Sequence, residues 1–103
     1  MLRCRTWVAR TVVMQGRPET IDEAKRIFSE SVIPAARQQK GFKGLLYLTD
    51  PVTGKGMSVT LWETEADMKA GEGSGYLQQQ IAKFGPLLAG PPTREVFVVA
   101  AQV

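Results

Sequence analysis

The sequence predicts an α+β domain whose elements follow the order strand, helix, strand, strand, helical segment, strand. Three observations predict this order. Apolar residues recur at helical spacing in two segments, β-branched and aromatic residues dominate four others, and glycine or proline lies at most of the junctions. A chain of 103 residues suffices for one such domain and is too short for two conventional ones. We therefore expect residues 1–103 to form a single domain.

The first strand is expected over residues 5–15, which are rich in Val, Thr, Trp and Met. Thr20 and Glu23 then have the spacing of a helix capping box. Apolar residues that follow at spacings of three and four predict an amphipathic helix: Ile21, Ala24, Phe28, Val32 and Ala35. Pro34 cannot donate a hydrogen bond to the carbonyl of Glu30, so we expect a kink or a restart of the helix there.

The middle of the chain predicts a hairpin and a short helix. Residues 42–49 and 56–63 have strand composition, and the turn-forming residues 50–55 connect them. After the second of these strands, Thr64 offers an N-cap for a short helix that ends near Gly71.

The last third of the chain predicts a further helix and a final strand. After the break at Gly73-Ser74-Gly75, apolar residues fall on one helical face: Leu77, Ile81, Phe84 and Leu88. Gly90-Pro91-Pro92 then turns the chain into a strand over residues 94–102. The complete order is that of a ferredoxin-like βαββαβ domain. Such a domain has a four-stranded antiparallel sheet, with the first and third strands in its centre and the helices on one face.

The expected strands are more apolar than those of a sheet that has one solvent-exposed face. Strands of that kind alternate between apolar and polar residues, whereas residues 96–101 read Val-Phe-Val-Val-Ala-Ala and residues 45–48 read Leu-Leu-Tyr-Leu. The second sheet face must therefore be covered, and a second copy packed about a two-fold axis is the simplest cover. We expect a homodimer formed through the open sheet face.

The composition excludes several kinds of site. Without histidine, the chain cannot build a Ser-His-Asp triad, a His-ligated haem or a zinc deaminase centre. Cys4 is the only cysteine, so neither an internal disulfide nor a thiolate cluster can form. We therefore expect no metal site.

Charge and hydropathy also bear on partners and location. A net charge of +3 is too small to indicate nucleic acid. No segment approaches the roughly 18 apolar residues that a membrane-spanning helix needs, and no apolar leader-type region is evident. We expect no nucleic-acid or membrane partner and a cytoplasmic location.

Two motifs carry a resemblance to a known family. Lys40-Gly41-Phe42-Lys43-Gly44 precedes a strand, and Leu61-Trp62-Glu63-Thr64-Glu65-Ala66-Asp67 joins the third strand to a helix. With the element order, they resemble the antibiotic biosynthesis monooxygenase family of the dimeric α/β barrel superfamily, over nearly the whole chain. That family includes cofactor-independent monooxygenases of aromatic polyketides, haem-degrading enzymes and small proteins without an assigned reaction.

The resemblance narrows the expected activity. Trp62 matches a tryptophan that lines the pocket in active relatives. The haem-degrading branch uses an axial histidine and an asparagine in the first strand, and this chain contains neither residue type, so haem degradation is not expected. In the polyketide-oxidising branch, the protein deprotonates and positions a phenolic substrate whose carbanion reduces oxygen, which implies no bound cofactor. Several members of that branch use an asparagine, and its absence is a departure from the pattern.

Arg10, Tyr47 and Trp62 are candidates for catalysis. Trp62 could stack on a flat substrate. Arg10 could hold a carboxylate, phenolate or enolate by two parallel hydrogen bonds. Tyr47 could donate to a substrate oxygen or, with a lowered pKa, act as a base. Each also has a structural interpretation: Trp62 packs under a helix or at the dimer seam, Arg10 is an ion-paired residue at a barrel rim, and Tyr47 lies in an interface.

Ser58 and Thr60 share one face of the third strand with Trp62, where a purely structural strand would carry Val or Ile. If this face meets the helices, the substrate-binding residues of a cavity would be Trp62, Ser58, Thr60, Phe28 and Tyr76. If the face meets a dimer partner, the same strand residues form a polar interface. The sequence leaves both arrangements open.

Three functions are consistent with the sequence. The first is a small cofactor-independent monooxygenase-like protein that acts on or binds an aromatic or quinol-type molecule. The second is a non-catalytic dimeric module that binds a ligand or serves a stress or regulatory role. The third, an RNA-binding domain, is disfavoured because the third strand lacks the paired exposed aromatic residues of RNA readers.

Overall fold

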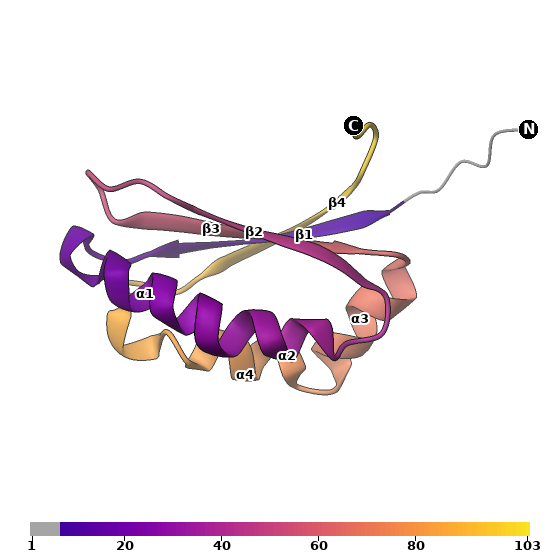
Figure 1. Ribbon diagram of the computed structural model, residues 1–103, viewed down its shortest axis with the longest axis horizontal. Coiled ribbons are helices and arrows are strands. Elements are labelled where there is room, and N and C mark those ends of the chain that lie inside the picture. The colour runs from indigo at the N-terminus through magenta and orange to yellow at the C-terminus, as the bar shows by residue number, and fades with distance from the viewer. Residues whose placement is uncertain (1–6) are drawn as a thin grey trace, which may run out of the picture.

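The computed structural model describes residues 7–103 and shows a twisted sheet with helices packed on one face (Figure 1). The sheet contains four antiparallel strands: β1 (Val8–Gln15), β2 (Phe42–Thr49), β3 (Lys55–Trp62) and β4 (Thr93–Val98). Their order across the sheet is β2-β3-β1-β4, so the first and third strands are central. The ferredoxin-like α+β fold expected from the sequence is confirmed.

The helical segments lie below the sheet in Figure 1, and no helix of the described residues covers its other face. The segments are the short turn η1 (Pro18–Thr20), helices α1 (Ile21–Ile27) and α2 (Ile33–Arg37) joined by the π-helical η2 (Phe28–Val32), then α3 (Glu65–Gly73), α4 (Tyr76–Ala82) and the turn η3 (Gly85–Leu87). The described chain is elongated, with extents of 50 × 28 × 22 Å.

The first long helix widens just before its proline. The N–H of Ile33 bonds to the carbonyl of Phe28, five residues back, and Pro34 then lies at the start of α2. Proline has no N–H to donate, so the i→i−4 hydrogen-bond series of an α-helix would be interrupted at Pro34. The wider π turn lies immediately before that position. The expected restart of the helix is therefore confirmed, and the π segment contributes the buried side chains of Phe28 and Val32.

Helix caps agree with the sequence in one case and differ in the other. Thr64 accepts a hydrogen bond from the backbone N–H of Asp67 at 3.0 Å and caps α3 as expected. The prediction that Thr20 and Glu23 form a capping box for α1 is wrong. The Thr20 hydroxyl instead bonds to the backbone N–H and carbonyl of Arg17 and closes the preceding turn, while Glu23 pairs with Arg26.

The outer strands and the chain ends also differ from expectation. Strand β4 ends at Val98, opposite Val8 at the start of β1, rather than continuing to residue 102. Only one further backbone hydrogen bond, from Val99 to Trp7, extends this pairing in the described residues. The part of the expected first strand at residues 5 and 6 lies outside them.

Two apolar clusters fill the space between sheet and helices. The larger one joins β1 to α1, η2 and α4: Val12, Met14, Ala24, Phe28, Val32, Leu77 and Phe84. The smaller one lies under α3 and contains Val8, Trp62 and Met68. These contacts show that the face of β3 with Ser58, Thr60 and Trp62 meets the helices.

On the opposite face of the sheet, the part formed by β2 and β3 is largely apolar, and no helix of residues 7–103 covers it. Strand pairing places Leu46 beside Val59 and Leu48 beside Met57 on this face. Leu46 is 59% exposed and Leu48 49%. Within residues 7–103, no helix is both long and apolar enough to cross a bilayer, and no cluster of three or more Cys, Asp or Glu side chains could hold a metal ion.

Candidate functional site

A cavity lies between the helix-facing side of the sheet and the helical segments η2 and α4. Its wall is largely apolar, formed by Val12, Met14, Phe28, Val32, Leu45, Leu77, Ile81 and Phe84, and its polar side chains are Arg10, Ser58, Thr60, Tyr76 and Gln80. The volume open to the centre of a water molecule is about 40 Å³. One water needs about 10–15 Å³ on this measure, so the enclosed part holds a few water-sized groups. A larger ligand would extend into the mouth.

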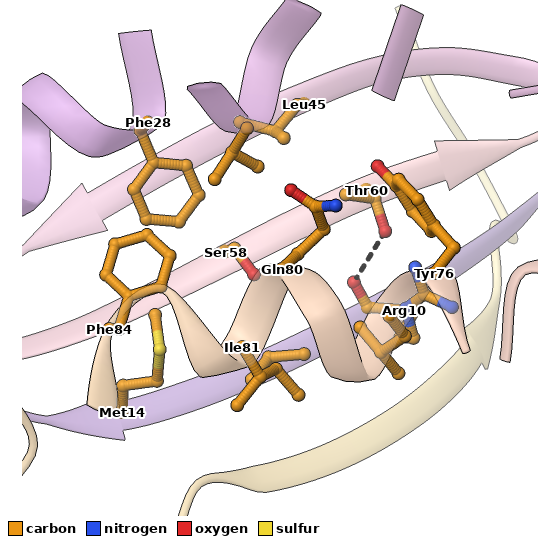
Figure 2. Close-up of a pocket in the computed structure, with 13 residues that line it drawn as sticks. Arg10, Met14, Phe28, Leu45, Ser58, Thr60, Tyr76, Gln80, Ile81 and Phe84 are labelled. Atoms are coloured by element: carbon orange, nitrogen blue, oxygen red, sulfur yellow. Dashed lines mark hydrogen bonds between the residues drawn. The ribbon is translucent and has the colours of Figure 1, made fainter. Parts of the chain in front are cut away.

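The cavity has an aromatic end and a polar end. Figure 2 shows the rings of Phe28 and Phe84 at one end and the side chains of Arg10, Thr60 and Tyr76 at the other. The two phenylalanine ring centroids are 4.8 Å apart. A ligand that combines a flat ring with a polar group would match this division.

Arg10 is the most deeply buried charged residue at the site, with only 2% of its surface exposed. Its Nη1 donates to the carbonyl of Met68 at 3.5 Å and to Oε2 of Glu72 at 3.2 Å. The guanidinium carbon lies 5.3 Å from the centroid of the Trp62 ring, a cation–π distance. Within residues 7–103, Nε and Nη2 make no hydrogen bond, so these donors remain for a ligand in the cavity that Arg10 lines.

Burial lowers the pKa of the Arg10 guanidinium, and its hydrogen bond to Glu72 opposes that effect. An arginine side chain nevertheless keeps its proton in proteins. The site therefore presents a fixed positive charge in apolar surroundings.

Glu72 is shared between two arginines. Arg94 donates from Nε to Oε2 and from Nη2 to Oε1, both at 2.7 Å, while Arg10 makes one longer bond to Oε2. Partial burial alone would raise the pKa of the Glu72 carboxyl, but the hydrogen bonds from Arg94 and Arg10 outweigh it and lower that pKa. Glu72 is thus held as a carboxylate.

Thr60 links the cavity to the smaller apolar cluster. Its Oγ1 accepts a hydrogen bond from Nε1 of Trp62 at 2.9 Å and donates to the backbone carbonyl of Arg10 at 3.4 Å. With its proton and a lone pair used in this way, Thr60 orders the wall around Arg10.

Ser58 and Gln80 both line the cavity (Figure 2), and each is 8% exposed. Oε1 of Gln80 accepts a hydrogen bond from Nζ of Lys83 at 2.7 Å. Within the described part of the chain, neither the Ser58 hydroxyl nor the Gln80 NH₂ group makes a hydrogen bond. Both groups are therefore available to a ligand or to water.

Tyr76 forms part of the wall near Arg10. Burial raises the pKa of its phenol, and the positive charge of Arg10 opposes the change only in part. Tyr76 is therefore a neutral hydrogen-bond donor near pH 7 and a poor base.

Most of the residues singled out in the sequence meet at this cavity. Those that line it are Arg10, Phe28, Ser58, Thr60 and Tyr76. Their roles in binding or catalysis stay predictions, but the arrangement left open by the sequence is resolved, because the polar face of β3 is turned toward the helices.

Trp62 does not line the cavity, which corrects the expected geometry. Its side chain is fully buried and packs against Val8 and Met68, with the Phe42 ring edge-on at 5.7 Å. Helix α3 brings Met68 over the end of the sheet and seals this region. Trp62 reaches the site only indirectly, through the hydroxyl of Thr60 and the guanidinium of Arg10.

Tyr47 also lies outside the cavity beside Arg10. Its ring stacks on Phe28 at 4.0 Å with an interplanar angle of 21°, and it lines a smaller neighbouring cavity of about 20 Å³. Burial raises the pKa of Tyr47. The lowered pKa that a base would need is therefore not found.

Sequence reasoning missed Gln80, Glu72 and Arg94. Gln80 had a readable signal, because it lies three residues after Leu77 and four before Phe84, within the apolar face of its helix. Glu72 and Arg94 are 22 residues apart in sequence. No local pattern connects them, since the sheet and α3 bring them together.

Neither a family model nor a curated protein sequence matches this chain. Solved structures do match it across nearly its full length. A protein of unknown function from Nitrosomonas europaea has 21% identity and a TM-score of 0.74, covering 96% of this chain and 94% of its own. A monooxygenase from the gene ActVA-Orf6 of Streptomyces coelicolor, in complex with nanaomycin D, has 19% identity and a TM-score of 0.73, covering 96% and 92%.

A further structure, named antibiotic biosynthesis monooxygenase, has 13% identity and a TM-score of 0.69, covering 87% of this chain and 95% of its own. At these identities the likeness concerns the fold. The resemblance to the antibiotic biosynthesis monooxygenase family is thus confirmed at the level of the fold.

Proposed function

We propose that this chain binds a small aromatic or quinol-type molecule in the cavity beside Arg10 and acts on it as a cofactor-independent monooxygenase-like protein. One observation carries the proposal. A buried guanidinium presents unused N–H donors to a cavity that is otherwise mostly apolar and that has aromatic rings at its far end. A phenol or quinol supplies the matching parts, an oxygen and a flat ring.

The electrostatics of the site favour the ionised form of such a ligand. A positive charge within about 4–6 Å stabilises an anion and lowers the pKa of its parent acid. Ionisation also makes a phenol ring electron-rich. Arg10 would therefore bind the phenolate oxygen while the apolar wall around Phe28 and Phe84 holds the ring.

The reaction needs no separate reductant. When O₂ converts a phenol to a quinone, the C–H bond opposite the hydroxyl breaks and a C=O bond forms there. The second oxygen atom leaves as water, with the hydroxyl proton and the ring hydrogen. Both electron pairs come from the substrate. The chain's contribution would be binding, orientation and stabilisation of the anion.

A non-catalytic binding role is the second candidate, and a specific observation favours it. The two tyrosines near the site have raised pKa values, so the described cavity offers no evident base. In the enzymatic alternative, the phenol proton would leave to solvent through the mouth of the cavity. Oxygen consumption separates the two candidates.

We also propose that two copies pack through the uncovered sheet face. Five apolar side chains lie beside one another on the outward side of β2 and β3: Leu46, Leu48, Met57, Val59 and Leu61. A two-fold interface brings the same patch of both copies together. None of these five side chains is charged, so like charges would not meet within the patch; the two lysines of these strands, Lys43 and Lys55, lie toward opposite ends of the hairpin.

The test of the binding proposal compares two neighbouring glutamines on α4. In Gln80→Leu, the cavity loses an amide but little volume, whereas Gln79→Leu makes the same change at an exposed position. We expect Gln80→Leu to weaken binding of 1-naphthol by about three- to tenfold, the range of one net hydrogen bond, and Gln79→Leu to leave it unchanged.

Isothermal titration under nitrogen measures the affinity, and an oxygen electrode then measures turnover to naphthoquinone. Binding with oxygen uptake supports the enzyme, and binding without uptake supports the non-catalytic role. If the wild-type chain does not bind 1-naphthol, or if both variants bind equally well, the proposed site is wrong.

A further inference from the structure

We propose that Glu72 and Arg94 are positioning residues that aim Arg10 at an ionised oxygen of the ligand, so that the site selects oxyanions over neutral molecules of the same shape. The inference rests on the proposed function, since it requires a ligand beside Arg10. It concerns residues that do not line the cavity.

The orientation of Glu72 depends mainly on Arg94. Arg94 holds both carboxylate oxygens with two bonds of 2.7 Å, whereas Arg10 contributes a single bond of 3.2 Å. A two-pronged arginine pair fixes the orientation of a carboxylate as well as its position. The orientation of Glu72 is therefore set mainly by Arg94, and Arg10 binds to the carboxylate that Arg94 has placed.

Arg10 is held on one side of its guanidinium. Its Nη1 is held by Glu72 and by the carbonyl of Met68, while the Trp62 ring lies against the guanidinium. All of its hydrogen bonds within residues 7–103 use this one nitrogen. Because the guanidinium is planar, anchoring Nη1 on this side fixes the directions of Nε and Nη2, the donors available to a ligand.

The cluster of Arg10, Glu72 and Arg94 is not electrically neutral. Two guanidinium groups share one carboxylate, so the cluster carries a net positive charge beside an apolar cavity. Tyr76 is the other titratable side chain at this end of the cavity, and its raised pKa keeps it neutral. The uncompensated charge belongs largely to Arg10, because Arg94 is 41% exposed and solvated. An anion is the ligand that such a buried charge favours.

Arg94 thus controls whether Glu72 competes with the ligand. With Arg94 in place, both oxygens of Glu72 accept hydrogen bonds from Arg94, and Arg10 donates only one hydrogen bond to Glu72. Without Arg94, the carboxylate could turn both oxygens toward Arg10, neutralise it and draw its donors away from the cavity. The loss of an exposed arginine on an edge strand would then weaken oxyanion binding inside the molecule.

The experiment uses 4-nitrophenol, which ionises, and 4-nitroanisole, which has nearly the same shape and cannot. Absorbance titrations at several pH values give the affinity for each form of nitrophenol. For the wild-type chain we expect the ionised form to bind about tenfold more tightly than the neutral one, a one-unit decrease in the pKa of the bound probe. In Arg94→Gln, this preference should fall to about threefold or less, with nitroanisole affinity unchanged.

Two further variants separate positioning from simple charge. Arg37→Gln removes a positive charge from an exposed position on α2 and should leave the preference unchanged. Arg94→Lys keeps the charge but cannot make the two-pronged contact, so we expect it to behave like Arg94→Gln.

If Arg94→Lys restores the wild-type preference, Arg94 acts through charge alone and the positioning role is wrong. If both probes bind and no Arg94 variant alters the preference, the inference fails while the proposed function stands. If neither probe binds to the wild-type chain, both are wrong.

Discussion

The guanidinium of Arg10 lies over the ring of Trp62, 5.3 Å from its centroid, and both side chains are almost completely buried. The contact joins the two parts of the interior. Trp62 belongs to the apolar cluster under α3, whereas Arg10 also lines the cavity. A cation–π pair of this kind contributes about 0.5–2 kcal/mol. The tryptophan therefore supports the site from behind rather than forming its surface.

Replacing Trp62 should affect stability first. In Trp62→Phe, the chain loses the hydrogen bond to Thr60, some buried surface and part of the contact with Arg10. We expect the free energy of unfolding to fall by about 1–3 kcal/mol, measured by urea denaturation.

The matched control is Trp7→Phe, because Nε1 of Trp7 is buried without a hydrogen-bond partner in the described residues. This change should cost clearly less, since no bond is lost. Equal losses for the two variants would contradict the role assigned to the Trp62–Thr60 bond.

Gly56 and Gly73 should respond in opposite directions to alanine. A Cβ at Gly56 would lie 3.0 Å from the Tyr47 hydroxyl, and the Tyr47 ring is already stacked on Phe28. We expect Gly56→Ala to lower the unfolding free energy by about 1–3 kcal/mol, the usual cost of overpacking. At Gly73 no atom lies within 4 Å of an added Cβ, so Gly73→Ala should be neutral or stabilise by up to about 1 kcal/mol. Thermal melts of both variants decide the matter, and a stabilising Gly56→Ala would refute the packing described for Tyr47.

The Glu72 carboxylate should make stability depend on acid pH. Its pKa is lowered in the folded chain, so folding favours the ionised form. The stabilisation is complete above the unfolded pKa of about 4.3 and is lost as the pH falls through the lower folded value. We expect Glu72→Gln to cost about 1.5–3 kcal/mol at pH 7, in the range for hydrogen bonds to charged groups, with the difference from wild type shrinking below about pH 4.

Urea titrations at pH 7, 5, 4 and 3 measure this dependence, because these pH values lie on both sides of the unfolded pKa of about 4.3. Glu65→Gln on the same helix, where the side chain is exposed, is the control and should differ little from wild type at any pH. If the cost of Glu72→Gln were constant between pH 7 and 3, the arginine-bound carboxylate would not be the source of the stabilisation.

The apolar sheet face should determine the oligomeric state. Leu46 is 59% exposed on that face and Val52 is 84% exposed in the hairpin turn. Sedimentation velocity should show a dimer for the wild-type chain and for Val52→Lys, and a monomer for Leu46→Lys, because the new charge would be desolvated at the seam. A monomeric wild-type chain at micromolar concentration would disprove the proposed dimer.

The sequence predicted the sheet well because the relevant signals are local. Alternation along β3 placed Ser58, Thr60 and Trp62 on one face, and the structure turns that face toward the helices. The restart of the first helix near Pro34 was also readable, since a missing N–H has the same consequence in any context. The cap at Thr20 was not, because its hydroxyl could bond equally well to the preceding turn.

The site was predicted less completely for a physical reason. Periodicity shows which side of the sheet Trp62 faces, but only the path of α3 shows that Met68 covers it. The network that orients Arg10 joins residues from β1, α3 and β4, and tertiary packing alone brings these together. Sequence patterns therefore identified several of the side chains at the cavity and missed the ion pairs behind them.

The most direct test of the central claim is a crystal structure of the chain with bound 4-nitrophenol. We expect the phenolate oxygen within hydrogen-bond distance, about 2.7–3.2 Å, of Nε or Nη2 of Arg10. The ring should lie against the apolar wall that includes Phe28 and Phe84, with the bonds from Arg94 to Glu72 intact. A probe bound elsewhere, or a site in which Arg10 donates only to protein groups while the cavity stays empty at saturating probe, would contradict the account.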